Sequence, residues 1–119
     1  MIKQLELVKE FHKKFNTPIL DKPSNISQDR FEFRHRLMDE EVQEYLEGAE
    51  KGDIVNVAKE LVDILYAVYG TILEHGLQDN FEEIFEEVHK SHMSKDYHQY
   101  KMVKGEDYFE PEIEELVRN

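Results

Sequence analysis

The sequence predicts an all-α protein in which four long helices form a bundle-like core and the C-terminal tail is irregular. Apolar residues recur at helical spacing through four segments, and short stretches rich in turn-forming residues separate these segments. The sequence contains no strand-like alternation of useful length, no internal repeat and no low-complexity segment. Long amphipathic helices joined by short links are typical of an all-α bundle.

The expected helices follow one another with recognisable ends. The first covers residues 2–15, and a loop with two prolines follows at 16–25. The next two should run to about Glu50 and His75, with Gly52 and Gly76 behind them, and the fourth should cover 81–95. The candidate N-caps of the second to fourth helices are Ser27, Asp53 and either Asp79 or Asn80. Residues 112–119 are expected to form a short last helix.

The composition narrows the class of protein. The chain has 119 residues and no cysteine, and its 27 acidic residues against 15 Lys and Arg give a net charge of −12. We expect one domain over 1–119 without disulfides or thiolate metal sites. So acidic a chain is a poor binder of nucleic-acid backbones. Because no apolar run reaches membrane-spanning length and the N-terminal segment lacks a signal-peptide core, we expect a cytoplasmic protein without a membrane partner.

The third expected helix is apolar on nearly every side, yet it carries two acids one turn apart. In KELVDILYAVYG (59–70), Glu60 and Asp63 lie on one narrow polar stripe that begins at Asn56 and continues through Ala67 and Thr71. A helix that is apolar all round is normally buried. A buried carboxylate has to be neutralised, paired or bound to a metal.

The second expected helix repeats this pattern. Glu41 falls between Leu37 and Tyr45 on the apolar face, and Glu44 falls beside Leu37, whereas Glu40 lies at the edge of that face. Two antiparallel helices that each present two inward carboxylates would form an oxygen-rich cage. Hard divalent cations bind such ligands, and Mg²⁺ is the expected ion, with Mn²⁺ as a substitute. Two solvated acidic faces would be the alternative.

The acids and their flanking segments resemble a known superfamily. EEVQE (40–44) followed by ELVD (60–63) matches the EExxE…ExxD signature of the all-α nucleoside triphosphate pyrophosphatases, which include MazG-like proteins, dimeric dUTPases and phosphoribosyl-ATP pyrophosphohydrolases. Further blocks in the same order look like the phosphoribosyl-ATP pyrophosphohydrolase branch. They cover most of the chain, at residues 10–18, 34–48, 59–76, 86–95 and 102–111.

The resemblance implies an activity and assigns roles to the acids. Members of this superfamily hydrolyse the α–β phosphate bond of a nucleoside triphosphate with Mg²⁺, releasing a monophosphate and pyrophosphate. Carried over by position, the expected metal ligands are Glu41, Glu44, Glu60 and Asp63. Glu40 would hold a further ion or orient the attacking water. The base of the substrate is left open, and phosphoribosyl-ATP itself is one alternative.

Three residues of the C-terminal part are candidates for phosphate contacts. Lys95 and His92 continue the apolar stripe of the fourth helix, and Lys104 matches a recurrent lysine of the related proteins. At the position of His92 the related block commonly has Asn, so this chain departs from the pattern there. The alternative for Lys95 is a lysine that extends to solvent from a helix end, and for Lys104 an ordinary surface lysine.

Two residues of the N-terminal part are further substrate-binding candidates. His12 lies toward the edge of the apolar stripe of the first helix, which in related proteins helps to wall the base pocket; a half-buried packing histidine is the alternative. Arg34 lies two turns before Glu41 and could pair with the acids or with a phosphate. The alternative for Arg34 is a surface position in contact with solvent and without a role in the site.

Two other classes of protein have to be weighed. A di-iron carboxylate bundle needs Glu-x-x-His motifs, which occur as Glu32/His35 and Glu86/His89, but these pairs fall away from the inward faces. A non-catalytic acidic helical adaptor is the second alternative, and an unused buried acid cluster would only destabilise it.

Since four helices cannot cover every side of the third one, we expect a homodimer or homotetramer, as the resemblance also implies.

Overall fold

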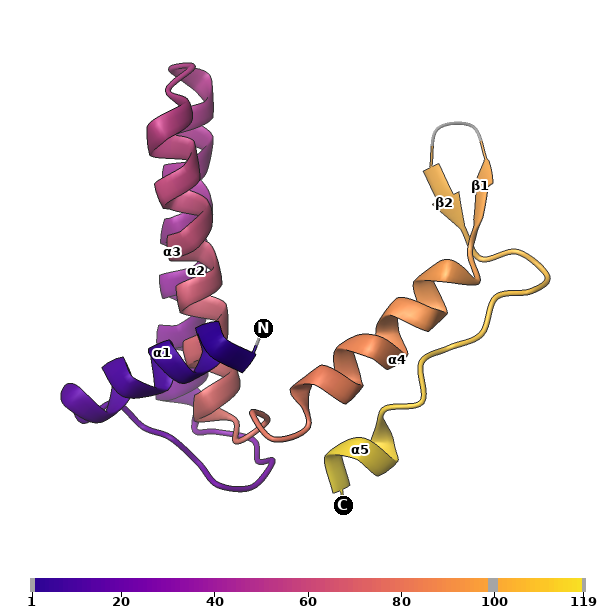
Figure 1. The fold of residues 1–119 in the computed structure, drawn as a ribbon, viewed down its shortest axis with the longest axis horizontal. Helices are drawn as coiled ribbons and strands as arrows, with labels where there is room; N and C mark the ends of the chain where they lie inside the picture. The colour runs from indigo at the N-terminus through magenta and orange to yellow at the C-terminus, as the bar shows by residue number, and fades with distance from the viewer. Residues whose placement is uncertain (1, 99–100, 119) are drawn as a thin grey trace. The chain divides into compact units, whose positions relative to one another are not determined.

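The computed structural model describes residues 2–98 and 101–118, which form two compact units, Met1–Gln78 and Asp79–Asn119. The first unit contains α1 (Ile2–Lys14), α2 (Gln28–Glu50) and α3 (Ile54–Glu74). The second contains α4 (Phe81–Met93), β1 (Asp96–His98), β2 (Lys101–Val103) and α5 (Glu114–Arg118) (Figure 1). The predicted all-α fold class is confirmed, whereas the single domain over 1–119 stays a prediction. No helix in the described residues is long and apolar enough to cross a membrane.

The predicted caps of α2 and α3 are confirmed. The Ser27 hydroxyl accepts a hydrogen bond from the backbone N–H of Arg30 at 3.4 Å, and the Asp53 carboxylate accepts one from Asn56 at 3.1 Å. Each bond satisfies an N–H that has no partner within the helix. After α3 the chain turns at Gly76, whose φ is +67°, and a Cβ there would lie 2.1 Å from the Lys22 carbonyl oxygen. Only glycine therefore fits this turn.

α2 and α3 lie side by side as a helical hairpin (Figure 1). The polar stripe of α3 faces α2, because Arg34 donates to Thr71 and to the Ala67 carbonyl. At one end a Cβ on Gly48 would lie 2.8 Å from the Asn56 amide nitrogen, so the two helices approach closely there. Ala67 is buried in the same stripe. The helices of the first unit do not cover the apolar sides of α3, because Leu61, Val62 and Leu65 are about half exposed. This exposure agrees with the expectation that the helices of one chain leave part of α3 uncovered.

α1 packs against α3. The ring of Phe11 meets the ring of Tyr66 edge to face at 5.3 Å between centroids, and Val8 is buried. The loop after α1 is attached to the end of α3 by a backbone hydrogen bond from Leu20 to the carbonyl of Leu73 at 3.0 Å. Together α1 and this loop cover one side of α3 and close the first unit.

The second unit differs from the sequence expectation in its tail. Residues expected to be irregular form a two-stranded antiparallel hairpin, with Asp96 opposite Val103, and its strands of three residues are too short to give a periodic signal. α4 ends at Met93, two residues earlier than expected. Asn80 occupies the N-cap position of α4, but its amide donates to the Leu116 carbonyl instead of capping the helix. Ser91 is buried and its hydroxyl donates to the Phe109 carbonyl at 2.7 Å, which fixes the tail to α4.

Candidate functional site

The four acids predicted as metal ligands converge between α2 and α3. Glu41 and Glu44 come from one helix and Glu60 and Asp63 from the other, each pair three residues apart. One oxygen of each carboxylate lies within 4.8 Å of the others. Residues three apart lie on one face of a helix, so two antiparallel helices are enough to bring the four groups together.

The burial of Glu60 distinguishes this cluster from an ordinary acidic surface, whereas Glu44 is exposed and Glu41 and Asp63 are partly exposed. Glu60 is only 5% exposed, and its Oε2 atom, like that of Glu41, is buried without a hydrogen-bond partner in the described structure. A buried carboxylate oxygen without a partner is strongly unfavourable. A cation bound between the two helices would give these two oxygens a partner.

The raised pKa values of two acids in the cluster also favour a bound cation. Burial raises the pKa of Glu41, and the negative charges of Asp63 and Glu60 raise it further. The pKa of Glu44 is raised first by its hydrogen bond with Glu60 and then by the charge of Glu41. Neighbouring carboxylates that repel one another favour either a shared proton or a bound cation.

The residues present fit a hard divalent cation. All four ligands are carboxylate oxygens, the donors that Mg²⁺ and Mn²⁺ prefer, and no sulfur or imidazole belongs to the cluster. The Glu-x-x-His pairs of a di-iron bundle are not part of it. Glu40 is exposed on α2, outside the group of four, and its predicted auxiliary role stays a prediction.

A cavity of about 310 Å³ opens beside the cluster, and Glu41 and Asp63 form part of its wall. The rest of the wall is mainly aromatic and aliphatic, with three polar groups. These lining residues are Phe11, His12, Thr17, Phe33, Arg34, Leu37, Tyr66 and Ala67. The volume is at the lower end of the range for small-molecule sites. A flat ring could be enclosed here with its charged substituents toward the acids.

Arg34 lies in this cavity wall, but its charge is already paired. It is 5% exposed, its guanidinium lies 3.1 Å from a carboxylate oxygen of Glu74, and it donates to Thr71 and to the Ala67 carbonyl. The alternative of a solvated surface position is wrong. The pairing with the four acids is also wrong, because Glu74 lies outside the cluster. Arg30 binds the same carboxylate at 2.8 Å.

His12 is more deeply placed than the half-buried histidine that we considered from sequence. It is 3% exposed, and its Nδ1 atom lies 3.1 Å from the Pro18 carbonyl. Burial lowers the pKa of His12 below its ordinary value, so the ring is neutral near neutral pH. With the proton on Nδ1 directed to the carbonyl, Nε2 is free to accept a hydrogen bond.

Three of the substrate-binding candidates, Lys95, His92 and Lys104, belong to the second unit, and the structure describes their positions only within that unit. Lys95 is half-buried and lies just beyond the end of α4, and His92 is exposed on α4. Lys104 is exposed and pairs with Glu110 at 3.1 Å. Their predicted phosphate contacts stay predictions.

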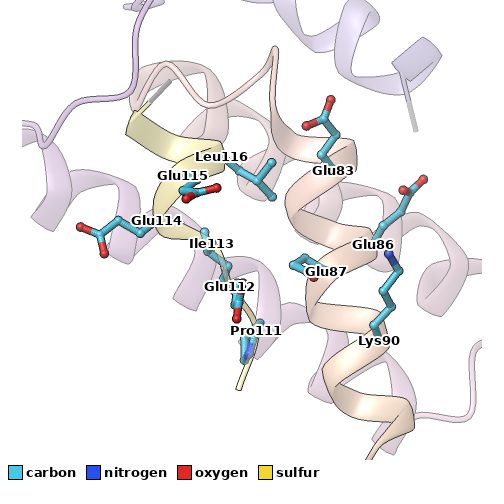
Figure 2. Close-up of a pocket in the computed structure, with 10 residues that line it drawn as sticks. All are labelled: Glu83, Glu86, Glu87, Lys90, Pro111, Glu112, Ile113, Glu114, Glu115 and Leu116. Carbon is cyan, nitrogen blue, oxygen red and sulfur yellow. The ribbon is translucent and has the colours of Figure 1, made fainter. Parts of the chain in front are cut away.

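A second cavity, of about 710 Å³, lies in this unit between α4 and the segment that leads into α5 (Figure 2). Six acidic residues line its walls: Glu83, Glu86, Glu87, Glu112, Glu114 and Glu115. Figure 2 shows them spread over both walls. None of them belongs to the group of converging acids found in the described residues. We therefore place the candidate site in the first unit.

Sequence reasoning missed two residues that bear on the site. Glu74 continues the polar stripe of α3 one turn beyond Thr71, so the helical spacing that revealed Glu60 could also have revealed it. Lys59 donates to Asp63 at 2.7 Å and lies 3.5 Å from Glu60. A lysine beside two acids on an exposed helix edge gives no signal that distinguishes it from a surface ion pair.

The helical fold and its carboxylate cluster define a class of all-α proteins with four acids between two helices that could hold a metal ion. The model of the phosphoribosyl-ATP pyrophosphohydrolase family matches residues 8–92, and the chain belongs to this family, within the MazG-like all-α nucleoside triphosphate pyrophosphatase superfamily. The match covers α2 and α3 with all four acids. Family membership points to a hydrolase with pyrophosphohydrolase activity on nucleotides. Among curated proteins no match was found.

Proposed function

We propose that this protein is a Mg²⁺-dependent nucleoside triphosphate pyrophosphohydrolase that cleaves the α–β phosphate bond and releases nucleoside monophosphate and pyrophosphate. The observation that supports it best is the carboxylate cluster, in which Glu41 and Glu60 each keep a buried oxygen without a partner in the described structure. Mn²⁺ would substitute for Mg²⁺ because both prefer carboxylate oxygens.

Each group of the first unit has a role in this proposal. Glu41, Glu44, Glu60 and Asp63 hold the cation, which when bound screens the phosphates and polarises the bond to be cleaved. Glu40, at the exposed edge of α2, orients the attacking water or binds a further ion. The two helices fix the carboxylates before substrate arrives, so little reorganisation is needed during the reaction.

The cavity beside the cluster would hold the nucleoside part of the substrate. Phe11, Phe33 and Tyr66 provide flat apolar walls, and aromatic side chains stack on any base. His12 and Arg34 provide polar groups at the same wall, and seven residues, or about 10 Å of helix, separate Arg34 from Glu41. That distance suits a base at one end and its phosphates at the other.

Two alternatives remain in view. The family takes its name from phosphoribosyl-ATP, so this compound is a candidate substrate. A non-catalytic helical adaptor is the other alternative, and the buried carboxylate of Glu60 argues against it because it would destabilise a protein that did not use it. We also propose phosphate contacts for Lys95, His92 and Lys104. A cytoplasmic location is a further proposal.

The test is a panel of nucleoside triphosphates and phosphoribosyl-ATP, incubated with Mg²⁺, with the products separated and identified. We expect pyrophosphate and a monophosphate as the first products from at least one compound. Orthophosphate and a diphosphate as first products would contradict cleavage at the α–β bond. No product from any compound, at protein and metal concentrations that saturate the site, would favour the adaptor.

We also propose that the protein works as a homodimer or homotetramer. Leu61, Val62 and Leu65 of α3 are about half exposed, and so are Phe11 and Val42 on its neighbouring helices. Apolar patches of this kind on a folded unit commonly mark a protein interface. A second copy would remove these side chains from water.

A further inference from the structure

Lys59 is the cation nearest to the candidate metal ligands among the described ion pairs. Its Nζ atom lies 2.7 Å from Oδ2 of Asp63 and 3.5 Å from Oε1 of Glu60. Both acids belong to the converging group of four. The two arginines nearby, Arg30 and Arg34, instead bind Glu74.

This ammonium neutralises only part of the cluster. Four carboxylates face one lysine, and the Oε2 atoms of Glu41 and Glu60 have no partner in the described structure. Among the four acids, the described ion pairs of Lys59 reach only Asp63, at 2.7 Å, and Glu60, at 3.5 Å. Lys59 therefore reduces the repulsion within the cluster without removing it.

The ammonium and a divalent cation compete for the same carboxylate. An oxygen 2.7 Å from Nζ cannot approach a dication without bringing two positive centres close together, and at such separations their repulsion is appreciable even in water. Lys59 can move away easily, because its side chain is 66% exposed and its four-carbon stem is flexible. Its departure leaves no buried cavity behind.

We propose that Lys59 is a built-in counter-ion of the metal site: it holds Asp63 and Glu60 in the metal-free protein and has to release Asp63 before a divalent cation can bind. Metal binding through Oδ2 of Asp63 and the Lys59–Asp63 ion pair are thus mutually exclusive. Lys59 stabilises the empty site and raises the metal concentration needed to fill it. This inference rests on the proposed metal site but not on the identity of the substrate.

The experiment measures metal binding directly, without nucleotide. Mn²⁺ and Mg²⁺ are titrated calorimetrically into the full chain and into Lys59→Met, Lys59→Arg and Lys51→Met. Because Lys59→Met removes one positive charge beside a dication, its dissociation constant should fall on the order of tenfold. Lys59→Arg keeps the charge and should stay near the unchanged protein. Lys51, exposed in the turn after α2, serves as the matched control, and its replacement should change the constant by less than about twofold.

Thermal unfolding provides the second readout. In the presence of a chelator, Lys59→Met should melt below the unchanged protein, because Asp63 and Glu60 lose their counter-ion. With saturating Mn²⁺ the difference should shrink or vanish, since the ion pair is then broken in both proteins. Lys51→Met should melt like the unchanged protein in both conditions.

The outcomes separate this inference from the proposed function. If the unchanged chain binds Mn²⁺ and releases pyrophosphate, but Lys59→Met binds the metal equally well or more weakly, the counter-ion role is wrong and the proposed function stands. If the unchanged chain binds neither metal, both are overturned. If Lys51→Met tightens binding as much as Lys59→Met, the effect is one of net charge, and the specific role of Lys59 is refuted.

Discussion

Asp63 takes part in each feature of the candidate site. Its carboxylate belongs to the converging group, accepts a hydrogen bond from Lys59 and forms part of the cavity wall beside Glu41. It therefore connects the place where a cation would bind with the place where a substrate would lie. A single carboxylate in this position has to satisfy both neighbours, which makes it the most informative residue to replace.

We expect Asp63→Ala and Glu44→Ala each to reduce turnover by a factor on the order of 10² or more. Each variant removes a ligand whose interaction is strongest in the transition state, so the loss should appear in kcat with little change in KM. Steady-state kinetics of pyrophosphate release measures both constants. Asp39→Ala, at an exposed acid of α2 outside the cluster, should keep normal activity. A fully active Asp63→Ala variant would refute the metal-dependent mechanism.

The burial of His12 should make stability depend on pH. Burial lowers the pKa of His12 below its ordinary value of 6.5, so the unfolded chain binds the proton more readily than the native one. The free energy of unfolding should therefore decrease as the pH falls below about 6.5. The raised pKa values of Glu41 and Glu44 act in the opposite direction, because the native state then binds the extra proton.

Comparison with a His12→Gln variant isolates the histidine from the carboxylates. Denaturant unfolding at a series of pH values should show a smaller loss of stability on acidification for His12→Gln than for the unchanged protein. His35→Gln, at an exposed position of α2, should follow the unchanged protein. Parallel curves for all three proteins would show that His12 does not titrate in a buried environment.

The individual acids could be predicted from the sequence, whereas their partners could not. Glu41 and Glu44 fall on the apolar face of α2. Glu60 and Asp63 fall on the one polar stripe of α3, so helical geometry predicts where the two pairs lie. The engagement of Arg34 with Glu74 depends on which carboxylate lies within reach across two helices. Residues 40 positions apart in the chain carry no local pattern that reports such a pair.

At the scale of the elements, the α2–α3 hairpin is unusual because a polar stripe lies at its centre. Arg34 crosses from α2 to donate to the Ala67 carbonyl and to Thr71 on α3. Gly70 lies between these contacts, and a Cβ there would come 2.4 Å from Nη2 of Arg34 and 2.8 Å from Nε2 of His12. The absence of a side chain at Gly70 therefore leaves room for the Arg34 guanidinium and the His12 ring beside α3.

Gly70→Ala should destabilise the first unit by about 1–3 kcal/mol. In an exposed helix this change would gain up to about 1 kcal/mol from helix propensity, but here the new methyl group would displace the guanidinium of Arg34, which three contacts hold in place. Denaturant unfolding measures the difference.

The double variant Gly70→Ala with Arg34→Met supplies the control. The methionine side chain is flexible and can move away from the new methyl group at position 70. It should lose less stability than the sum of the two single variants. A stabilising Gly70→Ala, or strict additivity, would mean that the close approach of Arg34 to Gly70 is not maintained in solution.

The elements themselves follow from the sequence more closely than their packing does. The caps at Ser27 and Asp53 and the break at Gly76 fixed the ends of α2 and α3, because capping chemistry is local. The hairpin at Asp96–Val103 was missed since three-residue strands leave no alternation to detect. Hydrophobicity alone would place an apolar side of α3 toward α2. The polar stripe was expected there only because Glu60 and Asp63 form a matching acid pair to Glu41 and Glu44.

At the scale of the whole molecule, the exposed apolar sides of α3 need an explanation. Leu61, Val62 and Leu65 are 48%, 58% and 48% exposed, on a helix whose polar side is the one turned toward α2. A helix with this distribution is stable in water only if another surface covers its apolar sides. The net charge of −12 keeps such a chain soluble as a whole but does not cover these residues.

We therefore expect the unchanged protein to be a dimer or tetramer, and Leu65→Glu to shift it toward the monomer. Stable interfaces bury about 1,200–2,000 Å² at roughly 25 cal/mol per Å² of apolar surface, and an unpaired carboxylate in the centre of one opposes association strongly. Light scattering after size-exclusion chromatography gives the mass of each species. Gln43→Glu adds the same charge on the exposed part of α2 and should leave the assembly intact. If Leu65→Glu retains the mass of the unchanged oligomer, the interface lies elsewhere; if the unchanged protein is itself a monomer at high concentration, the apolar sides of α3 are covered by another part of the chain.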